Sequence, residues 1–81
     1  MKTITTHNIF EASYYLTDES CVLSLVDTSE NIPVYSLLIN DEKYNEMREL
    51  FVTGMANANV SILSWKFGDL YRKSGYAGRI V

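Results

Sequence analysis

Two short apolar runs, residues 21–27 and Val34–Ile39, constrain the fold most, because both are rich in β-branched and aliphatic residues. The segment between them contains T-S-E-N at residues 28–31, a composition typical of turns. The pattern predicts an antiparallel hairpin. Ser24 and Ser36 are the main interruptions of the two runs, so one face of the hairpin must meet helices. We expect the other face to be half covered.

Three further segments repeat apolar residues at helical spacing, and each begins at a side chain that can cap free backbone amides. They are residues 8–17 with Asn8 or Thr6 as cap, residues 40–53 with Asn40, and Val60–Lys73 with Asn59. Gly54 suits the position after the second helix, and Gly68 inside the third predicts a close packing contact. Residues 3–6 alternate too briefly to assign more than an extended lead-in, with a short edge strand as the alternative.

The predicted fold is therefore a small α+β domain with the order α-β-β-α-α, in which an antiparallel hairpin packs against helices. A chain of 81 residues has room for one domain. At 47% hydrophobic and 21% charged residues, its composition is that of a folded domain rather than a disordered segment. We expect residues 1–81 to form a single compact domain with a flexible tail over about residues 75–81.

The residues that commonly carry catalysis or bind metals are scarce. Cys21 is the only cysteine, which excludes an internal disulfide and a cysteine-rich zinc site. His7 is the only histidine and has no second ligand or base near it in the sequence. Glycine patterns of nucleotide-binding loops and of nucleophile elbows are absent. We predict that the protein is not an enzyme and has no catalytic residues, metal or cofactor, and that Cys21 is a core residue.

Apolar runs long enough to act as a signal peptide or to span a membrane are also absent from the sequence. This predicts a cytoplasmic protein that does not bind a membrane.

Charge is distributed unevenly along the chain. The net charge is −3, but residues 1–60 carry nine acids and three bases, whereas residues 61–81 carry one acid and four bases. Glu42, Glu46 and Glu49 share one side of the second helix and form an acidic ridge, which we interpret as a solvated face. The overall negative charge argues against a general duplex-DNA binder.

The outer face of Val60–Lys73 is the first candidate binding surface. Trp65 and Arg72 are seven residues apart and therefore nearly in line on a helix. Tryptophan and arginine dominate interface energetics, and a ring beside cations also suits nucleic acid. The alternative is that Trp65 packs under the tail or against the first helix, while Asp69 bridges Lys66 and Lys73. The remaining members of this candidate surface are Ile62, Lys66 and Lys73.

The second candidate is a stripe on the first helix, where Phe10 and Tyr14 are four residues apart. This helix has more aromatic surface than so small a domain can bury. Either the stripe lies between the sheet and another helix, or it contacts a second protein. Self-association is the simplest form of the second possibility, because a symmetric dimer buries the same stripe twice.

Three short motifs resemble those of a small family, a domain of unknown function found in bacteria and tailed phages. They are T-H-N-I-F-E-A-S-Y-Y-L at residues 6–16, F-V-T-G at residues 51–54 and L-Y-R-K at residues 70–73. The resemblance implies a compact helix–hairpin–helix–helix domain in a phage or mobile-element setting. It implies no activity.

Together these observations predict a small non-enzymatic binding or regulatory protein that acts through protein–protein contacts, with self-association included. The alternative is a nucleic-acid-binding module that uses the basic and aromatic face of the last helix.

Overall fold

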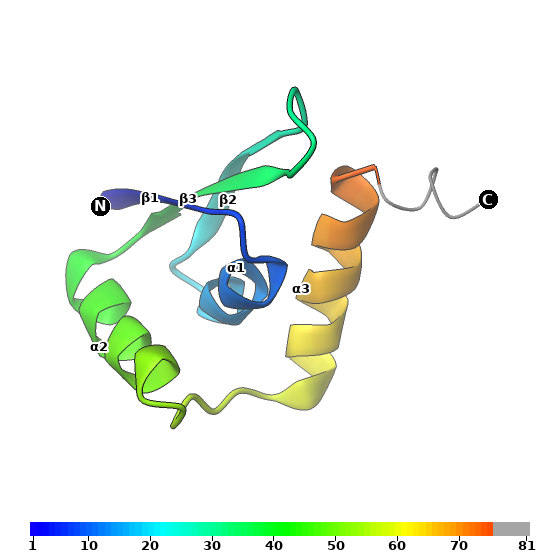
Figure 1. Cartoon of the computed structure of the whole chain (residues 1–81). Helices are drawn as coiled ribbons and strands as arrows, with labels where there is room; N and C mark the ends of the chain where they lie inside the picture. The colour runs from blue at the N-terminus through cyan, green and yellow to red at the C-terminus, as the bar shows by residue number, and fades with distance from the viewer. Residues whose placement is uncertain (76–81) are drawn as a thin grey trace.

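The computed structural model describes residues 1–75, in which a three-stranded sheet lies above three helices (Figure 1). The strands are β1 (Lys2–Thr6), β2 (Val22–Asp27) and β3 (Val34–Ile39), and the helices are α1 (Ile9–Leu16), α2 (Asp41–Val52) and α3 (Val60–Lys73). The α+β class and the β2–β3 hairpin are confirmed. Apart from Gly75, the predicted tail lies outside the described residues.

The predicted order α-β-β-α-α is wrong in one respect, since it omits β1. This strand pairs antiparallel with β3 and places Ile4 opposite Leu37, which gives the sheet order β1-β3-β2. A five-residue segment with a single aliphatic side chain has little tendency to form a strand alone. The edge of β3 supplies the backbone partners that make it a strand, and the paired residues are 29 to 37 positions apart in the sequence.

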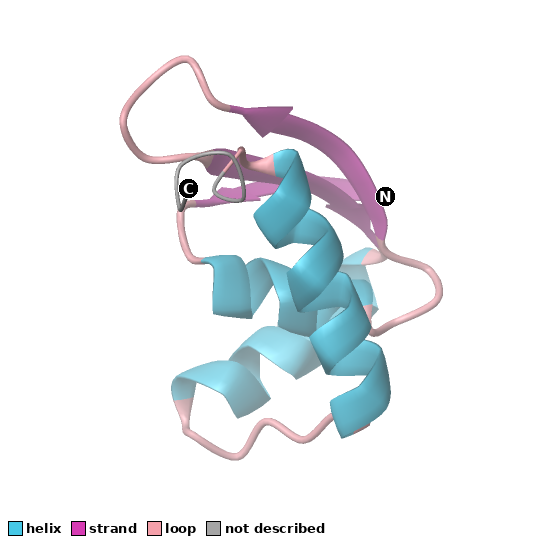
Figure 2. Ribbon diagram, turned by 90° about the vertical axis from the view of Figure 1, so that its right-hand side faces the viewer, coloured by secondary structure: helices cyan, strands magenta, loops and turns pink. Residues whose placement is uncertain are grey.

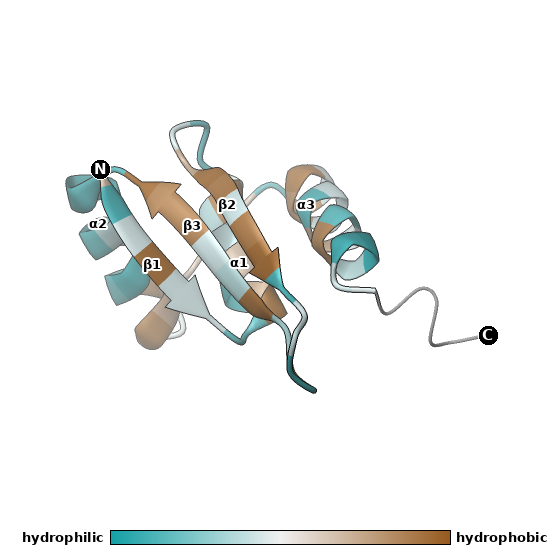
Figure 3. Cartoon of the chain, turned by 90° about the horizontal axis from the view of Figure 1, so that it is seen from above, coloured by the Kyte–Doolittle hydropathy of each residue, from teal (hydrophilic) through white to brown (hydrophobic). Residues whose placement is uncertain are grey.

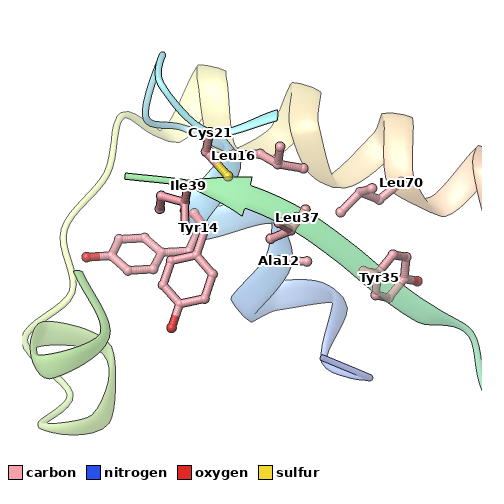
Figure 4. Close-up of a cluster of buried hydrophobic side chains, with 9 residues drawn as sticks. Ala12, Tyr14, Leu16, Cys21, Tyr35, Leu37, Ile39 and Leu70 are labelled. Atoms are coloured by element: carbon pink, nitrogen blue, oxygen red, sulfur yellow. The ribbon is translucent and has the colours of Figure 1, made fainter. Parts of the chain in front are cut away.

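The core lies between the sheet and α1. Inward-facing residues of β3 alternate with half-buried ones along the strand, as expected for a central strand with one covered face. From the side of α3, Figure 2 shows this helix in front of the others, with its C-terminal end near the sheet, and α3 packs mainly on α1. Figure 4 shows most of the buried apolar cluster, which consists of Ala12, Tyr14, Tyr15, Leu16, Cys21, Tyr35, Leu37, Ile39 and Leu70.

No element in the described part of the chain covers the opposite face of the sheet (Figure 3). A bulge between Leu23 and Leu25 sets Leu25 opposite Ser36, so its side chain joins Val22 on this outer face. Both apolar side chains are more than half exposed. The sequence predicted that the second face of the sheet is half covered, whereas residues 1–75 leave it open (Figure 3).

Side-chain caps determine where the helices begin. Asn8 Oδ1 accepts hydrogen bonds from the backbone N–H groups of Phe10 and Glu11. Asn40 and Asn59 cap α2 and α3 in the same manner. All three predicted asparagine caps are confirmed.

The end of α2 is determined by Gly54, which has φ of 76°. Met55 N–H donates to the Leu50 carbonyl, and Gly54 N–H donates to the Phe51 carbonyl. This pair of bonds is the Schellman arrangement, in which glycine adopts the left-handed conformation without steric penalty. It confirms Gly54 as the residue after the helix and directs the following segment toward α3.

The apolar side of α2 is only partly buried. None of its residues is fully buried, but Tyr44, Met47 and Phe51 pack as half-buried side chains against the core cluster. The close packing contact predicted at Gly68 is wrong, because a Cβ atom there would meet only Arg72 Nη1, at 3.7 Å.

Candidate interaction surface

The two aromatic residues of the predicted α1 stripe have different environments. Tyr14 is only 5% exposed, and its ring packs against Phe51 at 5.8 Å between centroids. Phe10 lies one turn earlier and is 65% exposed. The stripe is therefore divided between a core residue and a surface residue.

Phe10 is held in place although it is exposed. Its ring stacks on Phe67 of α3, with centroids 5.1 Å apart and an interplanar angle of 29°. Phe67 in turn stacks on Tyr71, with centroids 6.2 Å apart. Offset aromatic pairs at these distances stabilise by about 0.5–1.5 kcal/mol beyond their buried area. Phe10 therefore ends a short aromatic column that joins α1 to α3.

Two shallow hollows adjoin Phe10 and share its side chain and that of Leu63. The larger, of about 290 Å³, lies against α3. The smaller, of about 170 Å³, lies toward the end of α2 and the segment between α2 and α3. We use the name Phe10 patch for the eight residues that line one or both of these hollows: Phe10, Tyr14, Phe51, Ala56, Ala58, Leu63, Ser64 and Phe67.

The Phe10 patch carries no charged residue. Its side chains come from α1, α2, α3 and the segment between the last two helices, so it exists only in the folded chain. The apolar side of α3 is only partly covered: Leu70 is buried, Leu63 and Phe67 are half-buried, and Val60 is 75% exposed.

The outer face of α3 is also exposed, and its groups contact one another. Trp65 is 64% exposed, and Lys66 Nζ lies 4.5 Å from the centre of its ring. Asp69 contacts Lys73 Nζ at 2.8 Å and Arg72 Nη2 at 3.7 Å. The sequence interpretation paired Asp69 with Lys66 and Lys73, whereas Arg72 takes the place of Lys66. The three basic residues share this face with Trp65 and Ile62. Ile62, Trp65 and Lys66 also line a hollow beside Cys21.

Cys21, which the sequence predicts to be a core residue, is buried beside Leu16 and the first turns of α3. Burial, and to a smaller extent the Asp18 carboxylate, raises the pKa of its thiol to about 11. The thiolate is the reactive form, so Cys21 is a weak nucleophile near neutral pH. This agrees with the role of a core residue.

A polar cluster that the sequence interpretation missed joins β1, α1 and α2. The Glu11 carboxylate accepts hydrogen bonds from Thr6 Oγ1 at 2.7 Å and from the Tyr15 hydroxyl at 3.0 Å, and Arg48 Nη1 lies 3.5 Å away. Burial, followed by the bond to Glu11, raises the pKa of Tyr15. Glu11 and Arg48 are 37 residues apart in the sequence, and no local pattern indicates that they meet.

Among residues 1–75, no three histidine, cysteine or acidic side chains gather closely enough to hold a metal ion. The acidic ridge is exposed, and none of the described helices has the length and apolar character to cross a membrane. Comparisons with protein-family models, with curated proteins and with solved structures give no match. The resemblance to the phage-borne family therefore stays a prediction.

Proposed function

We propose that this protein is a small non-enzymatic binding module whose partner is a protein and whose contact surface is the Phe10 patch. One observation carries the proposal. Phe10 is 65% exposed and yet fixed, because it stacks on Phe67 between two apolar hollows. An aromatic side chain that is oriented before binding loses little conformational entropy when a partner covers it.

The energetics of Phe10 support this assignment. Fully burying a phenylalanine stabilises by about 1.5–3 kcal/mol, and an exposed fraction of 65% leaves more than half of that unrealised in the isolated chain. Folding does not require phenylalanine at the second position of α1, because Asn8 already caps the helix. Binding explains the residue better than folding does.

The composition of the patch gives independent support. The centres of protein interfaces are depleted in charge and enriched in aromatic residues. Five of the eight patch residues are aromatic or branched aliphatic, two are alanines and one is a serine. Such a surface fits a partner with apolar side chains.

A catalytic role has little support among the described residues. Cys21 is buried with a raised thiol pKa, and the Glu11 carboxylate is engaged by three neighbours. We include the cytoplasmic, phage or mobile-element setting in the proposal. It depends on the resemblance of residues 6–16, 51–54 and 70–73 to the family named above.

The proposal is tested by a photo-crosslinking amino acid at position 10 in cells that express the protein. The matched control carries the same group at position 25, where Leu25 is 57% exposed on the outer face of the sheet. We expect protein adducts from position 10 and few from position 25. Equal adduct yields at both positions, or none at either, would contradict the proposal.

Nucleic-acid binding by α3 is a second candidate, favoured by the exposed Trp65 ring beside Lys66, Arg72 and Lys73. Two contacts weaken it, since Lys66 already lies over the ring and Asp69 partly neutralises the other two cations. Trp65 is the only tryptophan, so its fluorescence reports on this face alone. Quenching by a single-stranded oligonucleotide that salt reverses would support binding, and unchanged fluorescence at low ionic strength would exclude it.

A further inference from the structure

The Phe10 patch belongs to an unusually uncharged part of the surface. Residues 50–65 contain no charged side chain over sixteen positions, yet thirteen of the sixteen are exposed and the other three are half-buried. Soluble surfaces carry roughly 25–35% charged residues, which would place about four or five charges in such a stretch. The segment is therefore composed like the centre of an interface.

The size of this surface can be compared with what a stable dimer requires. An aromatic side chain offers about 150–250 Å², so Phe10 with its half-buried neighbours leaves on the order of 400 Å² open in the patch. Val52, Met55 and Val60 belong to the same uncharged segment and are each at least 65% exposed. With them the uncharged surface reaches on the order of 700 Å², close to the roughly 800 Å² that each partner of a standard interface buries.

We propose that the partner which covers the Phe10 patch is a second copy of this chain, in a two-fold symmetric dimer. The inference rests on the proposed function, because it names the partner of that same surface. In the dimer, Phe10 of each copy enters the larger hollow of the other, between Leu63, Ser64 and Phe67.

Shape favours a second copy over an unrelated protein. The exposed Phe10 ring is itself one wall of the larger hollow, so that ring and hollow lie side by side on one surface. A two-fold axis between two such surfaces brings each ring to the opposite hollow.

Charge does not oppose this arrangement. The net charge of −3 gives two copies a weak mutual repulsion. The acidic ridge of Glu42, Glu46 and Glu49 lies on the side of α2 opposite Phe51, the α2 residue that belongs to the patch.

The test is sedimentation equilibrium of the full chain from about 10 µM to about 1 mM. We expect the mass to rise from 9.3 kDa toward twice that value. Phe10→Glu should weaken the dimer at least about 100-fold, because each dimer loses two buried rings and would bury two carboxylates. Trp65→Glu is the matched control, since Trp65 is 64% exposed on the other side of α3, and it should change the dissociation constant by less than about threefold.

A second variant covers the case in which Phe10→Glu unfolds the chain. Ser64→Arg leaves the Phe10 ring in place and puts a charged side chain into the larger hollow. It also replaces an exposed helical serine by a better helix former, so the fold should be retained. It too should abolish the dimer, while circular dichroism shows an unchanged fold.

Other results would overturn the inference. A dimer that survives both substitutions, or that Trp65→Glu alone disrupts, would place the contact elsewhere. A chain that stays monomeric throughout would exclude self-association. In that case, crosslinks from position 10 to a different protein would support the proposed function with another partner. The absence of such crosslinks would contradict both the dimer and the proposed function.

Discussion

The contrast between Phe10 and Tyr14 tests the division of α1 into a surface side and a core side. Tyr14 is 5% exposed and packs against Phe51, so Tyr14→Ala should cost about 3–5 kcal/mol of unfolding free energy, as is usual for a buried aromatic residue. Phe10 is 65% exposed, so the isolated chain realises only about a third of its burial energy, and Phe10→Ala should cost about 1 kcal/mol. The two substitutions remove similar rings from one helix.

Urea unfolding followed by circular dichroism at about 5 µM, where the dimer is largely dissociated, gives both values. We expect Tyr14→Ala to lose at least about 2 kcal/mol more than Phe10→Ala, which corresponds to a melting temperature lower by about 10 °C or more in a chain of this size. Raising the protein concentration should enlarge the effect of Phe10→Ala alone, because association then contributes to stability. Equal losses at low concentration would show that Phe10 is a core residue and would refute the reasoning.

Three further predictions concern the rest of the fold. Gly68→Ala should raise the unfolding free energy by about 0.5–1 kcal/mol, because the helical site has room for a methyl group; a loss would indicate a contact that the structure lacks. Cys21, whose pKa is raised to about 11 from 9.0, should react with a thiol reagent at pH 8 about 100-fold more slowly than a free cysteine. The raised pKa means that the folded state favours the protonated thiol. The stability that Cys21 contributes should therefore be complete below about pH 9 and lost toward pH 11, and Cys21→Ala should flatten the pH profile of stability over that range. Equal slopes for the two proteins would contradict the raised pKa. Glu11→Ala should cost about 1–3 kcal/mol because it removes the acceptor for Thr6 and Tyr15, whereas Glu42→Ala, on the exposed ridge, should change stability by less than about 0.5 kcal/mol in the same urea assay.

Local patterns in the sequence were sufficient for several elements. The predicted bounds of Val34–Ile39 and Val60–Lys73 are confirmed. Each segment shows its apolar repeat over its whole length and is delimited by a capping residue, a proline or a glycine. Asn8, Asn40 and Asn59 act through bonds within three residues, which a sequence reading can anticipate. β1 could not be assigned in this way, since its stability comes from a partner strand distant in the sequence.

The candidate surface was predictable only in part. The surplus of aromatic residues on α1 was apparent, but the division between Phe10 and Tyr14 depends on where α2 and α3 pack. Ala56 and Ala58 lie in a segment without periodicity, so nothing local assigned them to a surface. The one signal that could have found the patch is the absence of charge across residues 50–65.

The central claim is that the Phe10 patch is covered by a second copy of the chain. Amide chemical shifts of the uniformly ¹⁵N-labelled protein, recorded from about 20 µM to about 1 mM, test it residue by residue. A second copy on this surface predicts concentration-dependent shifts at the residues of the Phe10 patch, such as Phe10, Leu63 and Phe67, with little change at Val22 and Leu25. Shifts confined to Val22 and Leu25 on the outer face of the sheet, or none over the whole range, would contradict it.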